Sequence, residues 1–389
     1  CFRNHQRQYS RGYEDLMTKL KFNSNQAHSL GVELELGIVS TDTMALQSGS
    51  ERILKELADA SQDAFKHELV QSCIEVVSGV CTDVAEVRSD LGTKLDRLRK
   101  IALASGHDLW WGGTHPFSRW EEQDITRDDR YQSLLDMLQA MARRLVTFGL
   151  HVHVGVDSGD KAVMICDRIM QHLPMLLALS ASSPYWQGQD TGLCSYRSKL
   201  MEGLPTAGLP SLMRNWSEYV WLVNHMVETG FIKSIRELWW DVRPHHNFGT
   251  VEVRMCDMPG NLDHVCALTA LVQCLVKHLS DEIDEGTYQF DCHPMMVRQN
   301  KWCAARFGID ARLVNAKDYR VEPVRDIATS MVKRLGGISQ DLACESELAF
   351  LAEIVQQPGW AQQQRSIFQQ SNKTTEIVRQ LRQPSAEIT

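Results

Sequence analysis

Acidic, imidazole and guanidinium side chains recur at every second position in three short segments, residues 31–38, 150–156 and 250–255. Successive side chains of a β-strand point to opposite faces, so each segment predicts a strand with one apolar and one polar face. Neighbouring carboxylates repel unless a cation lies between them. Magnesium prefers carboxylate oxygens and keeps waters and phosphate oxygens as its other ligands, so these polar faces together suit metal–phosphate chemistry. Their polar members are Glu33, Glu35, His151, His153, Glu252 and Arg254.

Each segment alone also fits a plainer interpretation, because a solvent-facing strand of an antiparallel sheet alternates apolar and polar residues too. Solvent faces usually carry Lys, Thr, Ser and mixed charges, whereas these faces carry Glu-Glu, His-His and Glu-Arg pairs. A fourth segment, residues 67–75, adds Glu68 and Glu75. Their odd separation places them on opposite faces of a straight strand, so they share a site only if a turn, bulge or bend lies between them.

Several further residues admit both a functional and a structural interpretation. No Walker-type loop with lysine is present. The stretch Gly112-Gly113-Thr114 is a candidate nucleotide-phosphate loop, with Thr114 as the contact, or else a tight turn before Pro116. His151 is either a partner of a metal ligand or a satisfied polar side chain. The remaining candidates, which loops can use for function or for structure, are His115, His245 and His246.

These strands alternate with apolar patterns of helical period. Residues 1–27 are polar and are interpreted as a loosely held leader, and interleaved strands and helices without a linker predict one α+β domain over residues 28–389. The glutamine-rich tail has apolar residues spaced as in a packed helix. Helices are expected at residues 50–60, 84–105, 131–148, 161–181, 261–283 and within 356–383.

Composition narrows the class of protein. The 389 residues are 43% hydrophobic and carry a formal net charge of −8, which allows a sizeable core and disfavours nucleic acid as a partner. The longest apolar runs are too short to span a bilayer, so no membrane association is expected. Eleven cysteines lie scattered without a C-x-x-C pair. We therefore expect reduced, buried thiols in a cytoplasmic protein, without a zinc site.

The order and spacing of short motifs resemble the bacterial carboxylate–amine ligase family known as glutamate–cysteine ligase type 2. The resemblance runs from about residue 28 to the C-terminal helix. The motifs are GVELE (31–35), ELVQS (68–72), GGTHPF (112–117), FGLHVHVG (148–155), SPYWQG (183–188), SYRS (195–198), WDVRP (240–244) and GTVEVR (249–254).

This resemblance implies a fold similar to that of glutamine synthetase, in which an antiparallel sheet curves into a half-barrel with helices packed outside and the active site on the concave face. It also implies roles for individual residues. Arg254 matches a position that contacts the transferred phosphate, and Arg197 and Arg243 look like substrate or nucleotide contacts. The resemblance implies three catalytic residues, namely Arg254, Glu33 and Glu252. The positions that match magnesium ligands are Glu33, Glu35, Glu68, Glu75, His153 and Glu252.

The implied activity is an ATP- and Mg²⁺-dependent ligase, with Mn²⁺ as a substitute, that joins a carboxylate to an amine through an acyl phosphate. Glutamate and cysteine are the substrates that the family name implies, and a homodimer is a further implication. Two alternatives differ in class. A guanidino-type kinase would leave the phosphate on its acceptor, and a relic would bind metal or nucleotide without turnover.

Overall fold

The computed structural model describes residues 20–57, 64–287, 293–315 and 318–382. Within them, seven strands form one sheet in the order β10-β11-β5-β1-β3-β2, with β4 also paired to β1, and every pairing is antiparallel. The sheet is curved and unclosed, which confirms the expected α+β half-barrel. Its strands are β1 (Leu30–Ser40), β2 (Phe65–His67), β3 (Cys73–Val77), β4 (His107–Trp110), β5 (Gly149–Gly155), β10 (Val242–His245) and β11 (Thr250–Asp257).

The alternation in the sequence fixes which face of the sheet is buried. In β1 the side chains of Val32, Leu34 and Leu36 are fully buried in the main core. Glu33 and Glu35 between them point to the opposite face, because side chains alternate along a strand. The sheet thus presents one apolar face to the helices and one polar face away from them.

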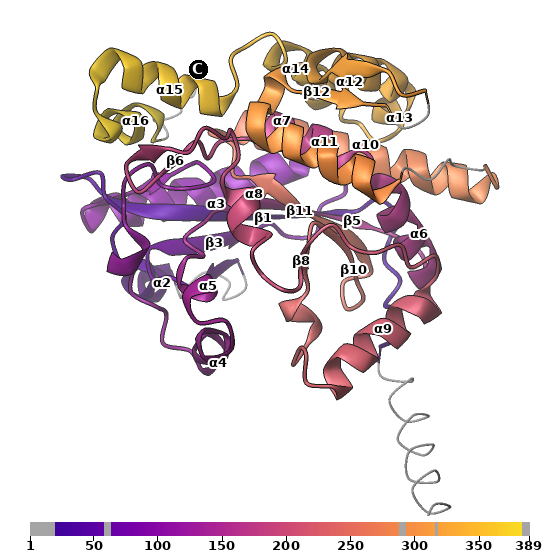
Figure 1. The fold of residues 1–389 in the computed structure, drawn as a ribbon, viewed down its shortest axis with the longest axis horizontal. Helices are drawn as coiled ribbons and strands as arrows, with labels where there is room; N and C mark the ends of the chain where they lie inside the picture. Colours follow the sequence, from indigo (N-terminus) through magenta and orange to yellow (C-terminus); the bar gives the residue numbers. More distant parts are fainter. Residues whose placement is uncertain (1–19, 58–63, 288–292, 316–317, 383–389) are drawn as a thin grey trace, which may run out of the picture.

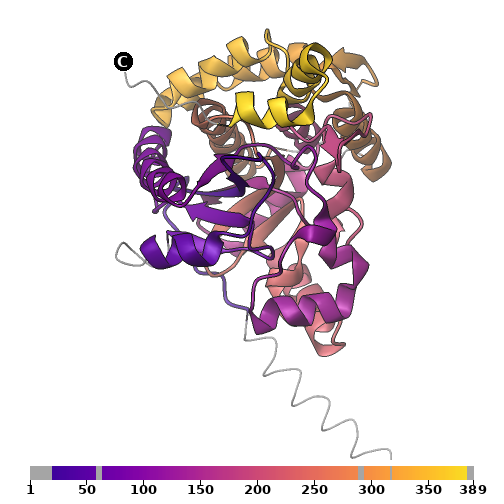
Figure 2. The same ribbon diagram turned by 90° about the vertical axis from the view of Figure 1, so that its left-hand side faces the viewer.

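Helices cover the apolar face. Figures 1 and 2 show α7, α10 and α11 lying over one side of the sheet, with α12 to α14 packed beyond them. The other side is flanked by α4 and α5 at one edge and α9 at the other (Figure 1). The helices of the first half are α2 (Ser50–Leu57), α3 (Val84–Ala104), α4 (Asp129–Leu138), α5 (Ala140–Arg143), α6 (Gly159–Ile169), α7 (Leu173–Ser180) and α8 (Arg197–Met201). Those of the second half are α9 (Trp216–Glu228), α10 (Leu262–Asp284), α11 (Pro294–Phe307), α12 (Val324–Arg334), α13 (Gly336–Asp341), α14 (Glu345–Ile354), α15 (Trp360–Ser371) and α16 (Thr374–Leu381).

Short elements complete the chain. Besides the main sheet there are three two-stranded pairs. They are β6 (Tyr185–Trp186) with β7 (Gln189–Asp190), β8 (Ala207–Gly208) with β9 (Trp239–Trp240), and β12 (Arg312–Val314) with β13 (Val321–Pro323). The 3₁₀ turns are η1 (Trp120–Glu122), η2 (Ile235–Glu237) and η3 (Gly308–Asp310).

The long helix α10 forms the centre of the helical layer. It begins at Asn261, whose side chain accepts a hydrogen bond from the backbone N–H of His264, as N-cap residues do. By length and composition α10 is apolar enough to cross a membrane, and so is the pair α6 and α7 if its bend of 67° is ignored. However, 78% of the apolar window of α10 is buried inside the protein, as in a core helix.

Two predicted helices are broken in the structure. The expected helix 131–148 ends at Leu138, because Gln139 adopts a left-handed backbone with φ of 50° that a helix cannot continue through, and only the short α5 follows. The expected helix 161–181 divides into α6 and α7, which meet at 67°. The predicted helices at 84–105 and 261–283 and the packed helical tail are confirmed by α3, α10, α15 and α16.

Part of the expected leader can be described. Residues 1–19 lie outside the described residues, but residues 20–27 are hydrogen-bonded to the sheet. The Asn23 N–H donates to the His246 carbonyl at 2.9 Å, and the Asn25 N–H donates to the Val156 carbonyl at 3.1 Å. A Cβ on Gly249 would meet the Asn23 carbonyl oxygen at 1.9 Å, so this segment lies tightly against the β10–β11 turn rather than loosely. Among the described cysteines, all but Cys303 are buried, as predicted.

Candidate active site

A cleft of about 440 Å³ opens on the polar face of the sheet. Side chains from β1, β3, β5 and β11 form its floor, and α4, α8 and the β9–β10 region supply its walls. The register explains why distant segments converge there. β5 lies between β1 and β11, so His151 faces Glu33 across one pairing and His153 faces Glu252 across the other. The members of the expected site that line the cleft are Glu33, Glu35, Glu68, Glu75, Arg197, Arg243 and Arg254.

Glu33, His153 and Glu252 form a compact group of potential metal ligands. One ligand atom from each lies within 4.8 Å of the others. The His153 Nε2 atom is 3.5 Å from Glu33 Oε1 and 3.7 Å from Glu252 Oε1. Two oxygens and one imidazole nitrogen thus face a common point, which is a donor set that Mg²⁺ and Mn²⁺ accept.

The imidazole of His153 is held in position by its other nitrogen. Nδ1 lies 3.0 Å from the Oγ1 atom of Thr250, and the ring is buried. Nε2 is buried and has no hydrogen-bond partner among the described residues. A buried polar nitrogen without a partner is costly unless something binds it. The contact with Thr250 leaves Nε2 as the ring nitrogen that faces the two carboxylates, and this is the atom that would bind a metal there.

Two histidines hold Glu33 in its charged form. His151 Nδ1 lies 3.0 Å from Glu33 Oε2. Burial alone would raise the pKa of Glu33, but the hydrogen bond with His151 and the nearby imidazole of His153 keep that pKa well below the ordinary value. The neighbouring carboxylate of Glu35 accepts the backbone N–H of Gly149 at 2.6 Å, which fixes it across the β1–β5 pair.

Two arginines surround the most deeply buried acid. Glu252 is 1% exposed, Arg243 donates to it from Nε at 2.7 Å, and Arg254 pairs with it from two residues along β11. Burial opposes the charge, yet these guanidinium groups hold the pKa of Glu252 well below its ordinary value. Arg243 also donates from Nη1 to the carbonyls of Ile235 and Leu238 at 2.8 Å, so the guanidinium group forms its hydrogen bonds with other groups of the protein.

A second acidic group lies beside the first. The segment predicted to hold Glu68 and Glu75 folds back on itself, because β2 and β3 are antiparallel and Glu68 lies in the connection between them. Because of this turn, Glu68 and Glu75 can reach the same site despite their odd separation in the sequence. Glu75 faces Glu35 directly across the β1–β3 pair. Burial and the repulsion from Glu75 and Glu35 raise the pKa of Glu68 well above its ordinary value, so these carboxylates crowd one another.

Arg197 closes the cleft from α8. It is 3% exposed, donates from Nη1 to the Met255 carbonyl at 3.2 Å, and leaves a buried Nε without a partner among the described residues. A Cβ on Gly149 would meet its Nη2 at 2.0 Å, so only glycine allows this approach. Asp257 orients the surrounding loop, since it accepts hydrogen bonds from the hydroxyls of Ser183 and Ser195.

The structure does not bring Thr114 into the cleft. Its hydroxyl is buried and donates to the Tyr185 carbonyl at 2.8 Å, which is the structural interpretation of the Gly112-Gly113-Thr114 turn. His115 is likewise buried, with Nε2 against the Met44 carbonyl at 2.9 Å. His245 does line the cleft, where its ring stacks on Phe248 with centroids 4.2 Å apart.

Two cleft residues have no signal in the strand alternation. Lys66 pairs with Glu75 at 2.8 Å, and Arg130 lies over the ring of Tyr131 at the start of α4. They belong to a short edge strand and to a helix that packs beside the sheet, so their positions follow from tertiary packing. Thr250, the partner of His153, was also missed, although it precedes Glu252 by two positions and therefore shares its face.

Comparisons with known proteins agree with this geometry. The sequence model of glutamate–cysteine ligase family 2 matches residues 29–383. A relative from Gloeobacter violaceus, provisionally named glutamate–cysteine ligase 2, is 41% identical over 364 residues, which cover 93% of this chain and 98% of the relative. A similarly named relative from Frankia casuarinae is 44% identical over 335 residues, covering 85% and 88%. Among solved structures, the glutamate–cysteine ligase of Francisella tularensis in complex with AMP superposes with a TM-score of 0.67 over 95% of this chain and 91% of that chain at 13% identity, a likeness of fold.

Proposed function

Because the chain belongs to glutamate–cysteine ligase family 2, we propose that it is an ATP-dependent ligase that joins the γ-carboxylate of glutamate to an amine such as that of cysteine. The observation that carries the proposal is that ligand atoms of Glu33, His153 and Glu252 lie within 4.8 Å of one another, with Glu33 lining the cleft and His153 Nε2 without a hydrogen-bond partner among the described residues. Two alternative functions, a guanidino-type kinase and a non-catalytic relic, can be distinguished from a ligase by the products that form.

The donor set suits Mg²⁺, with Mn²⁺ as a substitute. We assign Glu33, His153 and Glu252 as one ligand group, and Glu35, Glu68 and Glu75 as a second acidic group beside it. The crowding that raises the pKa of Glu68 would be relieved by a cation. When bound, such a cation neutralises phosphate charge and polarises the phosphoryl group.

Amide formation in water requires an activated carboxylate. In the proposed reaction a carboxylate oxygen attacks the γ-phosphorus of ATP and ADP departs, giving an acyl phosphate. The amine nitrogen then attacks the acyl carbon, phosphate leaves, and the nitrogen loses a proton. The first step brings two anions together, so the site must supply positive charge.

The arginines differ in what their surroundings leave them free to do. Arg254 keeps 16% of its side chain exposed at the cleft and is held there by Glu252, so we assign it to the charge on the transferred phosphoryl group. Arg197, whose Nε lacks a partner among the described residues, suits a substrate carboxylate by hydrogen bonding. Arg243, with its hydrogen bonds committed to Glu252 and two carbonyls, is assigned to holding Glu252 rather than to contacting substrate.

The substrates are small molecules, and the free, mostly buried thiols of the described chain fit a cytoplasmic location. The test is an assay with ATP, Mg²⁺, glutamate and a panel of amines that includes cysteine, followed by mass analysis of the products. Phosphate release that requires both the acid and the amine, together with an amide product, is expected. A phosphorylated acceptor would show that the protein is a kinase instead. If no combination of acid and amine supports ATP turnover, the protein is a non-catalytic relic.

A matched pair of variants connects the activity to the cleft. Glu33→Gln is expected to abolish turnover, whereas Glu353→Gln, an exposed position on α14, is expected to leave it unchanged. Equal activity in the two variants would contradict the assignment of the site.

A further inference from the structure

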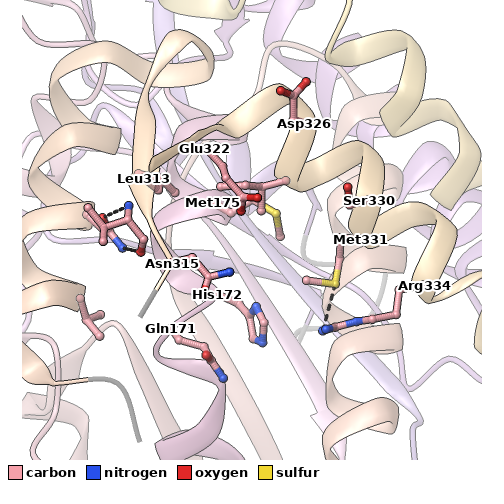
Figure 3. Close-up of a pocket in the computed structure, with 14 residues that line it drawn as sticks. Gln171, His172, Met175, Leu313, Asn315, Glu322, Asp326, Ser330, Met331 and Arg334 are labelled. Carbon is pink, nitrogen blue, oxygen red and sulfur yellow. Dashed lines mark hydrogen bonds between the residues drawn. The ribbon is translucent and has the colours of Figure 1, made fainter. Parts of the chain in front are cut away.

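A second cavity, of about 370 Å³, lies among α7, α11, the β12–β13 pair and α12 (Figure 3). None of the described residues that line it also lines the catalytic cleft. Small-ligand pockets in proteins usually have volumes of about 300–1,000 Å³, so this one has room for a molecule the size of an amino acid.

The floor of the cavity is apolar. Met175 of α7, Val297 of α11, Leu313 of β12 and Met331 of α12 are each at most 7% exposed. Methionine is unbranched and polarisable, so a floor with two methionines adapts to the shape of an aliphatic or thioether group. A charged group placed against this floor would lose its hydration without compensation.

The rim carries opposite charges that do not neutralise each other. Arg334 lies in the last turn of α12, and Glu322 lies on β13. Within the described part of the chain, neither forms an ion pair, and the contact of the Arg334 guanidinium is a weak one from Nη2 to the Met331 sulfur at 3.5 Å. In Figure 3 the two charged groups stand on different sides of the cavity.

A neutral imidazole also lines the cavity. Figure 3 shows His172 directed into the cavity from the start of α7. Burial and the charge of Arg334 lower the pKa of His172 to about 3, so the ring is uncharged at neutral pH. It contributes a hydrogen-bond donor and acceptor, and the charges that face a ligand are those of Arg334, Glu322 and Asp326.

We propose that this cavity binds a small zwitterion with an apolar side chain, namely a free aliphatic amino acid. Its carboxylate would pair with Arg334, since a guanidinium binds carboxylate through two parallel hydrogen bonds. Its ammonium would face Glu322, and its side chain would rest on Met175 and Met331. An acidic amino acid would place its second carboxylate near Glu322 or on the apolar floor, so the site disfavours glutamate.

The test is a saturation-transfer NMR titration of the full chain with L-leucine, without nucleotide or metal. It uses the Glu33→Gln variant, so the result is independent of turnover in the cleft. We expect saturable binding that Arg334→Ala and Glu322→Gln each weaken about tenfold, the effect of losing one charge-assisted hydrogen-bonded pair. Lys333→Ala is the matched control, because Lys333 is an exposed neighbour of Arg334 that does not line the cavity.

Two analogues test the zwitterion itself. 3-Methylbutylamine lacks the carboxylate and 4-methylpentanoate lacks the ammonium, so each is expected to bind about tenfold more weakly than L-leucine. The proposal is overturned by the absence of saturable leucine binding, by analogues that bind as well as leucine, or by a loss of binding in Lys333→Ala equal to that in Arg334→Ala. Unchanged melting temperatures of the variants would show that the comparison concerns binding alone.

Discussion

Replacing Thr250 with valine tests how the site orients its imidazole. Thr250 is buried, and its Oγ1 atom lies 3.0 Å from Nδ1 of His153. Valine has nearly the same shape but cannot bond to the ring. The Thr250→Val variant therefore keeps Glu33, His153 and Glu252 in place and removes only the contact that fixes the tautomer and orientation of His153.

The expected magnitudes separate metal binding from folding. Loss of a partner that orients a metal-bound histidine typically weakens metal affinity about 10- to 100-fold. That corresponds to about 1.4–2.7 kcal/mol. The cost in folding free energy is smaller, about 1 kcal/mol, because one buried hydrogen bond is lost. We therefore expect a large shift in Mg²⁺ dependence in a protein of nearly normal stability.

The assay measures ligation rate against Mg²⁺ concentration at saturating substrates, with urea unfolding in parallel. Thr269→Val is the matched control, because Thr269 is also buried and donates a hydrogen bond of 2.8 Å, but to the Val265 carbonyl within α10. We expect both variants to lose similar stability and only Thr250→Val to require more Mg²⁺. An unchanged Mg²⁺ dependence in Thr250→Val would refute the orientation of His153 by Thr250.

Three further predictions concern other parts of the molecule. Arg254→Ala should lower kcat by about 10²–10³-fold with little change in melting temperature, since it removes one charge that stabilises the transition state; near-normal kcat would contradict its role. Gly149→Ala should lower kcat/KM by about 100-fold, because its Cβ would meet Arg197 Nη2 at 2.0 Å and displace the guanidinium; wild-type kinetics would show that this position is not critical. The free energy of unfolding in urea should fall as pH drops from 6.5 toward 3. Burial lowers the pKa of His115 to about 3, so in this pH range the unfolded chain binds a proton at this histidine and the folded chain does not. The slope should reach about 1.4 kcal/mol per pH unit from this group alone, and a pH-independent urea midpoint over that range would contradict it.

The polar faces of the central strands could be predicted from the sequence because side-chain alternation is a local property. It placed Glu33 and Glu35 on one face of β1, as the burial pattern of that strand confirms. The pairing of strands is not local. That β5 lies between β1 and β11, and so sets His153 opposite Glu252, depends on the whole chain.

Other features could not be predicted for physical reasons. The break at Gln139 has no proline or glycine to mark it, and a left-handed glutamine is stabilised only by its surroundings. The hydrogen bonds from Arg243 to two backbone carbonyls could not be predicted from its motif, because those carbonyls belong to a segment just upstream whose conformation the sequence does not reveal. Glu68 and Glu75 meet only because their connection turns back, which an odd spacing alone leaves undecided.

The most direct measurement of the central claim is pulsed electron paramagnetic resonance of Mn²⁺ bound to the protein with ADP. The account predicts a nitrogen coupling from a directly coordinated imidazole in the wild type, and its loss in His153→Gln. A spectrum without imidazole coupling, or one that His153→Gln leaves unchanged, would contradict a metal centre formed by Glu33, His153 and Glu252.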